Sequence, residues 1–244
     1  MSKKGYSMRC LIIIPAYNEE NSIANVIKEI QEKCSFADYL VVDDCSTDNT
    51  RGRLNMLGAN YISGPVNLGI GGAVQAGYKY AQKNNYDIAI QVDGDGQHDV
   101  AYIKAMVELI EAKKADIVIG SRFINKEGFQ SSGTRRMGIN ILSGLIFLMC
   151  GKHVKDVTSG FRAVNRMFID IYAKDYPDDY PEPEAIVTAV LNGGKVEEVP
   201  VIMRERQTGQ SSINLKRSIY YMVKVSLAII ICRISLGFRR DKKK

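Results

Sequence analysis

Ile88-Ala89-Ile90-Gln91-Val92-Asp93-Gly94-Asp95 is the stretch that decides the fold of this 244-residue chain. A largely apolar run leads directly into two carboxylates spaced i and i+2, and Gly94 and Gly96 keep the turn open. In an open α/β sheet, ligands bind at the carboxyl ends of the strands. Carboxylate oxygens at this spacing suit Mg²⁺ or Mn²⁺ bound together with a diphosphate. A solvated acidic turn is the alternative for an isolated pair, so the rest of the chain decides between the two interpretations.

Short apolar segments alternate with helical patterns through the first 120 residues. The near-continuous apolar run 9–14 is typical of a strand buried on both faces of a sheet. Apolar residues then recur at helical spacing from Ile23 to Ile30, and Asn21 or Ser22 can cap that helix. The alternation predicts an α/β fold with a doubly wound, mostly parallel sheet flanked by helices. The expected strands are 9–14, 39–42, 60–63, 87–92, 116–119, 156–164 and 195–203, and the expected further helices are 49–57, 103–112 and 137–150.

Three connecting segments are polar or rich in glycine. Residues 69–81 resemble a glycine-rich loop that runs into a helix, and 176–184 is expected to be a loop. Residues 120–134 are polar and contain glycine, which predicts a mobile loop over the strand ends. The simplest organisation is one compact domain over 1–213 followed by an appendage over 214–244.

The composition is that of a globular protein with a sizeable core, because 45% of the residues are hydrophobic and 25% are charged. The formal net charge is +6, and lysine and arginine gather at both ends of the chain. That distribution suits an anionic surface or substrate, or a solubilising tail, and we expect no nucleic-acid partner. The five cysteines form no C-x-x-C pair, which indicates reduced thiols in a cytoplasmic protein. No signal peptide is expected, since the run 8–14 is short and ends at Pro15.

Other interpretations of these motifs fit less well. Segment 69–74 has Val74 where a dinucleotide-binding fingerprint needs its third glycine. As a calcium loop, the segment starting at Asp93 has His98 at the position of the turn glycine and Lys104 at the position of the bidentate glutamate. A phosphatase with an aspartate nucleophile would carry its motif near the N-terminus, with aspartate and lysine partners in an order that this chain lacks.

Six short motifs follow one another along the chain: Ile13-Ile14-Pro15-Ala16-Tyr17-Asn18-Glu19, Val41-Val42-Asp43-Asp44-Cys45-Ser46-Thr47-Asp48, Asn67-Leu68-Gly69, Asp93-Gly94-Asp95-Gly96-Gln97-His98, Gly120-Ser121-Arg122-Phe123 and Thr158-Ser159-Gly160-Phe161-Arg162. In content and order they resemble family-2 glycosyltransferases of the GT-A fold, particularly the polyprenyl-phosphate sugar synthases related to dolichol-phosphate mannose synthase. The resemblance extends from residue 12 to about residue 213. Any single motif would be a weak indication, whereas six in register are a strong one.

The resemblance implies that a nucleotide-diphosphate sugar, with a UDP-sugar favoured, is the donor. Asp93, Asp95 and Gln97 are expected to surround Mg²⁺ or Mn²⁺, a Lewis acid that stabilises charge on the leaving diphosphate. Arg122 and Arg206 are expected to make bidentate contacts to phosphate, and a surface ion pair is the alternative for either arginine. The implied catalytic residues are Asp95, Glu184 and Arg122, and the implied nucleotide-sugar contacts are Pro15, Tyr17, Glu19, Asp44, Asn67, Gly69, Asp93, Gly94, Arg122, Arg206 and Ser212.

Two positions depart from the family pattern. Ser212 stands where the mannose synthases usually carry lysine, so one phosphate contact is expected to be missing or taken over by Lys216. In Tyr180-Pro181-Glu182-Pro183-Glu184, Glu184 best matches an acidic residue that serves as general base in many inverting members, and Glu182 is the neighbour to compare. A lipid phosphate is already largely ionised at pH 7, so such an acceptor needs positioning more than a base. Glu184 would then orient sugar hydroxyls.

The C-terminal segment bears on the acceptor. Residues 219–238 are largely apolar but are interrupted by Lys224 and Arg233, and the uninterrupted stretch 225–232 is too short to span a bilayer. With the basic tail, the segment predicts an amphipathic helix at the surface of anionic lipid. A helix packed on its own domain or on a small membrane protein is the alternative.

Together these patterns predict an inverting, metal-dependent glycosyltransferase that transfers a sugar to a polyprenyl phosphate at the cytoplasmic face of the cell membrane. Two alternatives stay open. The acceptor could be a hydroxyl of a saccharide or lipid-linked saccharide, with Glu184 as base. The chain could also be a non-catalytic, membrane-associated scaffold.

Overall fold

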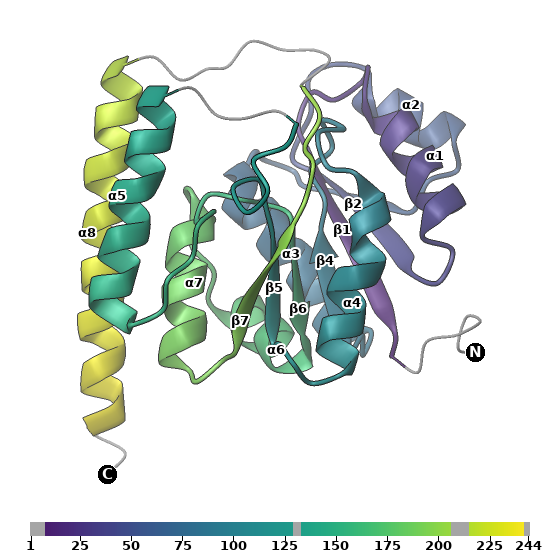
Figure 1. Ribbon diagram of the computed structural model, residues 1–244. Coiled ribbons are helices and arrows are strands. Elements are labelled where there is room, and N and C mark those ends of the chain that lie inside the picture. Colours follow the sequence, from purple (N-terminus) through teal and green to yellow (C-terminus); the bar gives the residue numbers. More distant parts are fainter. Residues whose placement is uncertain (1–7, 129–132, 206–214, 242–244) are drawn as a thin grey trace.

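A seven-stranded sheet forms the centre of the molecule (Figure 1). The computed structural model describes residues 8–128, 133–205 and 215–241. The strand order is β3-β2-β1-β4-β6-β5-β7, and neighbouring strands are parallel except where β6 pairs with β4 and β5. The predicted α/β class and mostly parallel sheet are therefore confirmed. The strands are β1 (Cys10–Ala16), β2 (Asp38–Asp43), β3 (Tyr61–Ser63), β4 (Ile88–Gln91), β5 (Ile117–Ser121), β6 (Arg162–Asn165) and β7 (Val196–Pro200).

The register of the central strands brings their polar ends together. Ala16 at the end of β1 lies opposite Asp43 at the end of β2. Just past these ends, the Asp44 amide donates to the Ala16 carbonyl at 2.9 Å, and the Gly94 amide donates to the Pro15 carbonyl at 3.3 Å. The carboxylates that follow β2 and β4 therefore lie at one edge of the sheet, on either side of β1.

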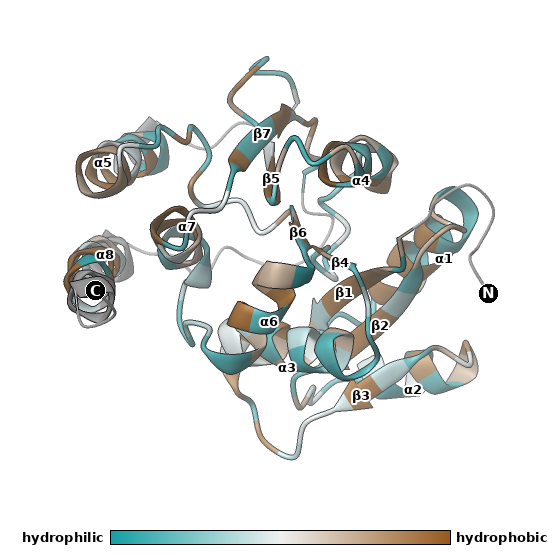
Figure 2. Cartoon of the chain, turned by 90° about the horizontal axis from the view of Figure 1, so that it is seen from below, coloured by the Kyte–Doolittle hydropathy of each residue, from teal (hydrophilic) through white to brown (hydrophobic). Residues whose placement is uncertain are grey.

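Helices cover both faces of the sheet, as Figure 2 shows in a view from below. Leu11 and Ile13 of β1 belong to one apolar cluster, and Ile12 and Ile14 belong to the other. This division explains why the first strand is an unbroken apolar run. The first cluster takes in α3, α5, α6, α7 and α8, and the second takes in α1, α2 and α4. The helices are α1 (Ile23–Lys33), α2 (Thr50–Met56), α3 (Gly69–Lys83), α4 (Ile103–Glu111), α5 (Gly133–Cys150), α6 (Arg166–Lys174), α7 (Pro181–Leu191) and α8 (Leu215–Asp241), with a short 3₁₀ helix η1 (Val100–Tyr102) before α4.

The long helix α8 lies beside α5 at one side of the molecule and also packs on α7 (Figures 1 and 2). Val225 and Ile229 of α8 are buried in the same cluster as the side chains of the sheet. The ring of Tyr221 meets the edge of the Tyr180 ring, with centroids 4.6 Å apart. The appendage expected over 214–244 thus shares the core of the preceding residues, and the functional division at 213 stays a prediction. Within the described ranges, no helix combines the length and the apolar character needed to cross a bilayer.

The glycine-rich segment after residue 68 is helical from its first residue, because α3 begins at Gly69. The predicted helix is therefore confirmed, but the glycine-rich loop predicted to lead into it is wrong. A Cβ atom on Gly71 would lie 2.0 Å from the Pro177 carbonyl oxygen, and one on Gly77 would lie 2.3 Å from the Ile13 side chain. These glycines allow close packing of α3 on the strand and on the segment before α7.

The second half of the chain also differs from the expected pattern. Strand β6 begins at Arg162 rather than at residue 156, and α6 was not expected. Helix α7 begins at Pro181, inside the segment 176–184 that was predicted to be a loop. Gly120 and Ser121 end the buried strand β5, so the predicted mobile loop starts too early; residues 129–132 lie outside the described residues.

Candidate functional site

A cavity of about 490 Å³ opens at the carboxyl ends of β1, β2 and β4. The chain segments after three strands and the start of α3 contribute to its wall. Most of the residues predicted from sequence for donor and metal line it, namely Pro15, Tyr17, Glu19, Asp44, Asn67, Gly69, Asp93, Gly94 and Asp95. Arg122, Glu184 and Gln97 are not among the described residues that line the cavity.

A second cavity, of about 570 Å³, lies where β2 begins and α1 ends. Its described lining contains one carboxylate, Asp38, and neither lysine nor arginine. The Asp38 carboxylate already accepts a 3.0 Å hydrogen bond from the Tyr86 hydroxyl. The paired carboxylates make the first cavity the candidate site.

Asp44 ties the end of β2 to the start of α3. Its Oδ1 accepts a 2.7 Å hydrogen bond from the Leu68 amide, and its carbonyl oxygen accepts one of 3.1 Å from Asn67 Nδ2. Asn67 Oδ1 in turn accepts from the Gly69 amide at 3.1 Å, and Gly69 has a φ of +75° that suits glycine. The arrangement places the positive end of the α3 dipole beside the cavity, where it favours an anionic ligand.

The Asp93 carboxylate is held from several directions. Gln91 Nε2 donates to its Oδ1 at 3.2 Å, and the Asp93 amide donates to His98 Nδ1 at 3.1 Å. His98 Nδ1 is thus an acceptor, which places the ring proton on Nε2, 3.6 Å from Asp93 Oδ2. The His98 ring is buried and stacks on Phe161, with centroids 4.8 Å apart. A Cβ atom on Gly160 would lie 3.2 Å from both carboxylate oxygens, so the backbone there also limits Asp93.

Asp95 and Gln97 connect the turn after β4 to the segment after β7. Asp95 Oδ1 accepts from the Gln97 amide at 3.0 Å, and Gln97 Nε2 donates to the Arg204 carbonyl at 3.3 Å. The Arg204 side chain makes two hydrogen bonds, of 2.7 and 2.8 Å, to the Glu29 carboxylate. The Arg204 guanidinium, through that hydrogen bond, is the main cause that lowers the pKa of Glu29 to about 2. This anchor fixes the chain at Arg204, while the predicted donor contacts Arg206 and Ser212 lie outside the described residues.

The predicted metal ligands fit a cation whose coordination is completed by oxygen atoms of a bound substrate. Among the described residues there is no group of three or more His, Cys, Asp and Glu side chains that could hold a metal ion alone. Asp93 and Asp95 nevertheless line the cavity together, and Asp93 is held in a defined orientation. Mg²⁺ is commonly held by one or two carboxylates together with substrate phosphates and water. The donor set therefore suits a divalent cation that arrives with a diphosphate, and Gln97 stays a predicted ligand.

Arg122 lies in a buried ion pair instead of the cavity wall. Its Nε and Nη2 donate to the two carboxylate oxygens of Asp156, each at 2.7 Å, and Nη2 also reaches the Thr158 hydroxyl at 3.1 Å. The bidentate geometry satisfies most of the guanidinium. A phosphate contact by Arg122 stays a prediction, and the structure shows it bridging the end of β5 to the segment before β6.

The two glutamates of α7 lie in different surroundings. Burial raises the pKa of Glu182, which also interacts with Arg162, Asp93 and Arg135. Burial likewise raises the pKa of Glu184, but the charge next to it is Asp175. The structure therefore brings Glu182 toward the Asp93 side of the molecule. The assignment of Glu184 as the base stays a prediction, and Glu182 has the better position.

Two arginines at the start of α5 were not predicted. Arg135 has its pKa lowered, first by burial and then by the nearby Arg122 charge, and it also interacts with Tyr221 and Glu182. The Arg136 guanidinium lies 3.4 Å from the centroid of the Phe123 ring, and its buried Nη1 has no hydrogen-bond partner among the described residues. Cations in the first turn oppose the helix dipole, and no acidic residue compensates there. Two adjacent arginines at the start of a predicted helix, without an acidic residue beside them, are the feature of the sequence that could have marked them as functional candidates.

Comparisons with known proteins agree with this geometry. The profile of Glycosyl transferase family 2 matches residues 11–172. Polyprenol monophosphomannose synthase of Mycolicibacterium smegmatis is 28% identical over 219 residues, which cover 85% of this chain and 82% of that protein. UDP-N-acetylglucosamine--dolichyl-phosphate N-acetylglucosaminyltransferase of Methanococcus voltae is 32% identical over 210 residues, covering 78% of this chain and 83% of that protein.

A solved structure shares the fold at lower identity. Glucosyl-3-phosphoglycerate synthase from Mycobacterium tuberculosis, in complex with Mn²⁺, UDP-glucose and phosphoglyceric acid, superposes with a TM-score of 0.72 at 19% identity, covering 95% of this chain and 80% of that one. Fold, motif order and sequence identity point the same way, and this chain belongs to glycosyl transferase family 2 and is a glycosyltransferase.

Proposed function

We propose that this glycosyltransferase is inverting and metal-dependent, and that it moves a hexose or N-acetylhexosamine from a nucleotide-diphosphate sugar to a polyprenyl phosphate. A UDP-sugar is the favoured donor. The observation that carries the proposal is the cavity between Asp44 and the start of α3 on one side and Asp93 and Asp95 on the other. It pairs groups that suit a nucleoside with carboxylates that suit a cation on a diphosphate.

In this proposal, the donor lies along the cavity wall. Asp44 supplies an acceptor for a base or ribose donor group, and the N-terminus of α3 favours the negative charge of the diphosphate. Asp93 and Asp95, with Gln97 as a further candidate, would hold Mg²⁺ or Mn²⁺. When bound, the cation would supply Lewis-acid stabilisation of the charge that grows on the leaving diphosphate.

A phosphate acceptor suits the two arginines at the start of α5, of which Arg135 interacts with Glu182. Arg135 and Arg136 provide positive charge at the start of α5, and within the described part of the chain Arg136 Nη1 has no hydrogen-bond partner. The lipid phosphate is largely ionised at pH 7, so its oxygen can attack the anomeric carbon without losing a proton first. The new C–O bond forms as the bond to the β-phosphate oxygen breaks, and the nucleotide diphosphate leaves with the electron pair. The polyprenyl- and dolichyl-phosphate acceptors named for the two relatives support this choice.

A hydroxyl acceptor is the second candidate, because one observation favours it. Burial raises the pKa of Glu182 on the Asp93 side of the molecule, and a carboxylate of raised pKa is a better general base. In that case Glu182, or Glu184 as predicted from sequence, would take the proton of a saccharide hydroxyl. A scaffold without activity is not favoured, since the carboxylates and the cavity are in place.

We further propose that the enzyme works at the cytoplasmic face of the membrane as a peripheral protein. Helices α5 and α8 lie side by side and both expose large apolar side chains. A polyprenyl phosphate keeps its head group at the bilayer surface, so an apolar face near the site suits it. The exposed residues are Met137, Ile141, Phe147 and Leu148 on α5, and Tyr220, Val223, Leu227, Ile231 and Ile234 on α8. A small membrane protein is the alternative partner for this face.

Product analysis tests the proposal directly. Purified enzyme, undecaprenyl phosphate in detergent and a panel of radiolabelled UDP- and GDP-sugars should yield an organic-soluble product of inverted anomeric configuration with at least one donor. Transfer only to saccharide hydroxyls would support the second candidate instead. Absence of transfer to either acceptor class would contradict both.

A further inference from the structure

Arg162 is fully buried at the first residue of β6, yet none of its hydrogen bonds in the described structure goes to a carboxylate. Its charge interacts with Tyr78, Tyr172 and Tyr176, whose ring centroids are 5.1 to 5.4 Å from one another. Burial is the largest influence on the pKa of Arg162 and lowers it, but Tyr176, Glu182, Tyr78 and Tyr172 together leave the pKa above its ordinary value. The guanidinium is therefore charged inside the protein. A buried charge that makes no direct hydrogen bond to a carboxylate in the described structure is costly, even with the Glu182 charge nearby, so its retention calls for a role.

The guanidinium joins the segment before β6 to the first turn of α7. Its Nη2 donates to the Ser159 carbonyl at 2.6 Å, and its Nη1 donates to the Glu182 carbonyl at 3.3 Å. Ser159 directly precedes Gly160, whose backbone lies against the Asp93 carboxylate. Glu182 is in the first turn of α7, next to Tyr180, which has a left-handed φ of 52°. One planar side chain thus fixes both the Gly160 segment and the Glu182 turn.

The strand register extends this connection to Asp93 itself. Arg162 pairs with Gln91 across the β4–β6 ladder, and Gln91 Nε2 is the donor to Asp93 Oδ1. The contacts of the Asp93 carboxylate with Gln91 and Gly160 therefore both depend on the chain around Arg162. Lysine cannot replace this arrangement, because an ammonium group on one flexible stem lacks the fork geometry that spans two carbonyls.

We infer that Arg162 is a positioning residue for sugar transfer: it holds the Gly160 segment and the Glu182 turn so that the Asp93 carboxylate keeps one orientation toward a cation-bound nucleotide diphosphate. The inference rests on the proposed function. Arg162 acts through other residues, and its effect should appear in nucleotide binding as well as in turnover.

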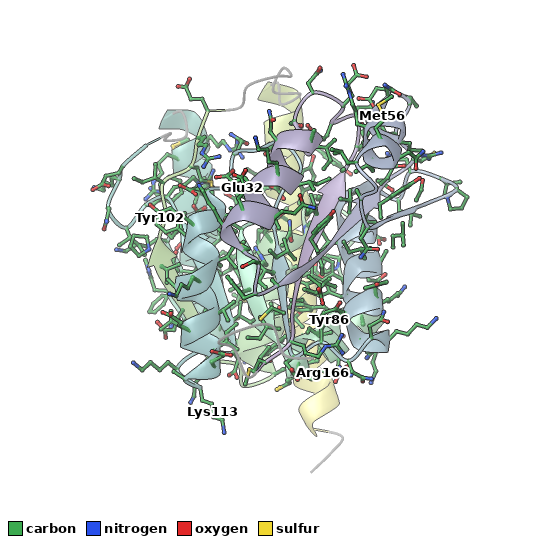
Figure 3. The ribbon with its side chains drawn as sticks, turned by 90° about the vertical axis from the view of Figure 1, so that its right-hand side faces the viewer. Glu32, Met56, Tyr86, Tyr102, Lys113 and Arg166 are labelled. Atoms are coloured by element: carbon green, nitrogen blue, oxygen red, sulfur yellow. The ribbon has the colours of Figure 1, made fainter. Side chains whose placement is uncertain are left out.

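Arg166 provides a control, and unlike Arg162 it is partly exposed and forms an ion pair with Asp170. It also donates to two carbonyls, those of Tyr86 and Gln82 at 3.2 and 3.4 Å, but it lies at the other end of the strands (Figure 3). We would compare Arg162→Lys, Arg162→Met and Arg166→Met with the wild type. The measurements are urea unfolding, calorimetric affinity for UDP and for GDP in the presence of Mn²⁺, and kcat and KM for transfer.

Replacement of Arg162 by lysine should weaken nucleotide affinity in Mn²⁺ and lower kcat, each by about 10- to 100-fold, as is typical when the groups that orient a metal ligand are removed. Arg166→Met should leave both within about twofold. Wild-type affinity and kcat in Arg162→Lys would overturn the inference. So would an equal loss in Arg166→Met, since the effect would then be general destabilisation.

Gly160→Ala tests the same relationship if the Arg162 variants fail to fold. The added Cβ atom would lie 2.9 Å from Gln91 Nε2 and 3.2 Å from the Asp93 oxygens, while Arg162 remains. It should reduce nucleotide affinity in Mn²⁺, whereas Gly144→Ala, where nothing lies within 4 Å, should not. Equal affinities in the two alanine variants would overturn the inference. If the wild type binds nucleotide but transfers no sugar to polyprenyl phosphate, the proposed function fails, and the affinity comparison still tests whether Arg162 is a positioning residue. If the wild type binds neither UDP nor GDP, both the proposed function and the inference about Arg162 are overturned.

Discussion

The guanidinium of Arg122 and the carboxylate of Asp156 form a bidentate ion pair that is almost entirely shielded from water. Asp156→Asn should lower the free energy of unfolding by about 3 kcal/mol, because it leaves a buried arginine charge without its partner. Urea unfolding measures the change. Glu32→Gln is the control, since Glu32 is an exposed partner of Lys28 on α1 (Figure 3), and its effect should stay within about 0.5 kcal/mol. Equal effects of the two substitutions would show that the Asp156 pair is not important for stability.

Removal of the divalent cation should abolish transfer. Asp95→Asn should slow transfer by at least about 10²-fold, the scale of losing a major electrostatic stabiliser. Initial rates in EDTA, and then with Mn²⁺ or Mg²⁺ restored, measure the requirement. Glu108→Gln on the exposed side of α4 is the control and should behave like the wild type. Full activity in EDTA, or wild-type turnover by Asp95→Asn, contradicts the metal assignment.

Substitution of the two α7 glutamates should separate their roles. We expect Glu182→Gln to slow transfer more than Glu184→Gln, because Glu182 interacts with Asp93 and Glu184 with Asp175. For a hydroxyl acceptor, loss of a general base should cost about 10²- to 10⁴-fold, whereas a phosphate acceptor should show a milder defect. Rates for both variants with each acceptor class make the comparison. A larger defect in Glu184→Gln would support Glu184, the residue predicted from sequence, as the general base.

The ionised Glu184 carboxylate should lower the free energy of unfolding, and the size of this effect should depend on pH. Burial, followed by the Asp175 charge, raises its pKa above the ordinary 4.5, so the folded state disfavours the ionised form. The resulting loss of folding stability is complete at pH values above the pKa of Glu184 in the folded state. It disappears below the pKa in the unfolded state, where the carboxyl is protonated in both states. Glu184→Gln should therefore raise the free energy of unfolding at neutral pH, and the gain should vanish near about pH 4. A gain that is constant with pH would contradict this explanation.

Attachment to lipid should depend on the exposed apolar residues of α8. Truncation of the helix is a poor test, because Val225 and Ile229 belong to the core. Leu227→Gln with Ile231→Gln changes side chains that are 54% and 62% exposed and should weaken sedimentation with anionic liposomes at low salt. Met56→Gln is the control, since Met56 is 78% exposed on α2, which lies on the opposite side of the molecule from α8 (Figure 1). If the wild type does not bind such liposomes in the absence of a partner protein, the exposed apolar face of α8 serves association with a protein instead.

The sheet and the carboxylates that line the cavity at its strand ends could be predicted from sequence because their determinants are local. An unbroken apolar run followed by carboxylates specifies a buried strand and its ligand-binding end, as at β4 and Asp93. Helix α7 was missed because Pro181 and Pro183 resemble a loop, although proline is well suited to the first helical turn. The choice between Glu182 and Glu184 depends on that helix, since residues two apart on a helix point about 200° away from each other.

Long-range pairing was the part that local patterns could not supply. The sequence around Arg122 gives no sign of its ion pair with Asp156, which lies 34 residues later. Similarly, nothing near Arg162 in sequence indicates the Glu182 carbonyl, which reaches it only through the packing of α7. A charged side chain can be recognised from sequence, but its partner depends on the tertiary fold.

The packing of α8 on α5 and α7 also has a consequence for biosynthesis. This helix follows all seven strands in chain order, yet Val225 and Ile229 fill the same apolar cluster as α5 and α7. While the ribosome is still adding α8, the completed sheet leaves part of that cluster uncovered, and exposed apolar surface of this kind is prone to aggregation. The nascent chain therefore needs α8, or a chaperone in its place, to cover this apolar surface.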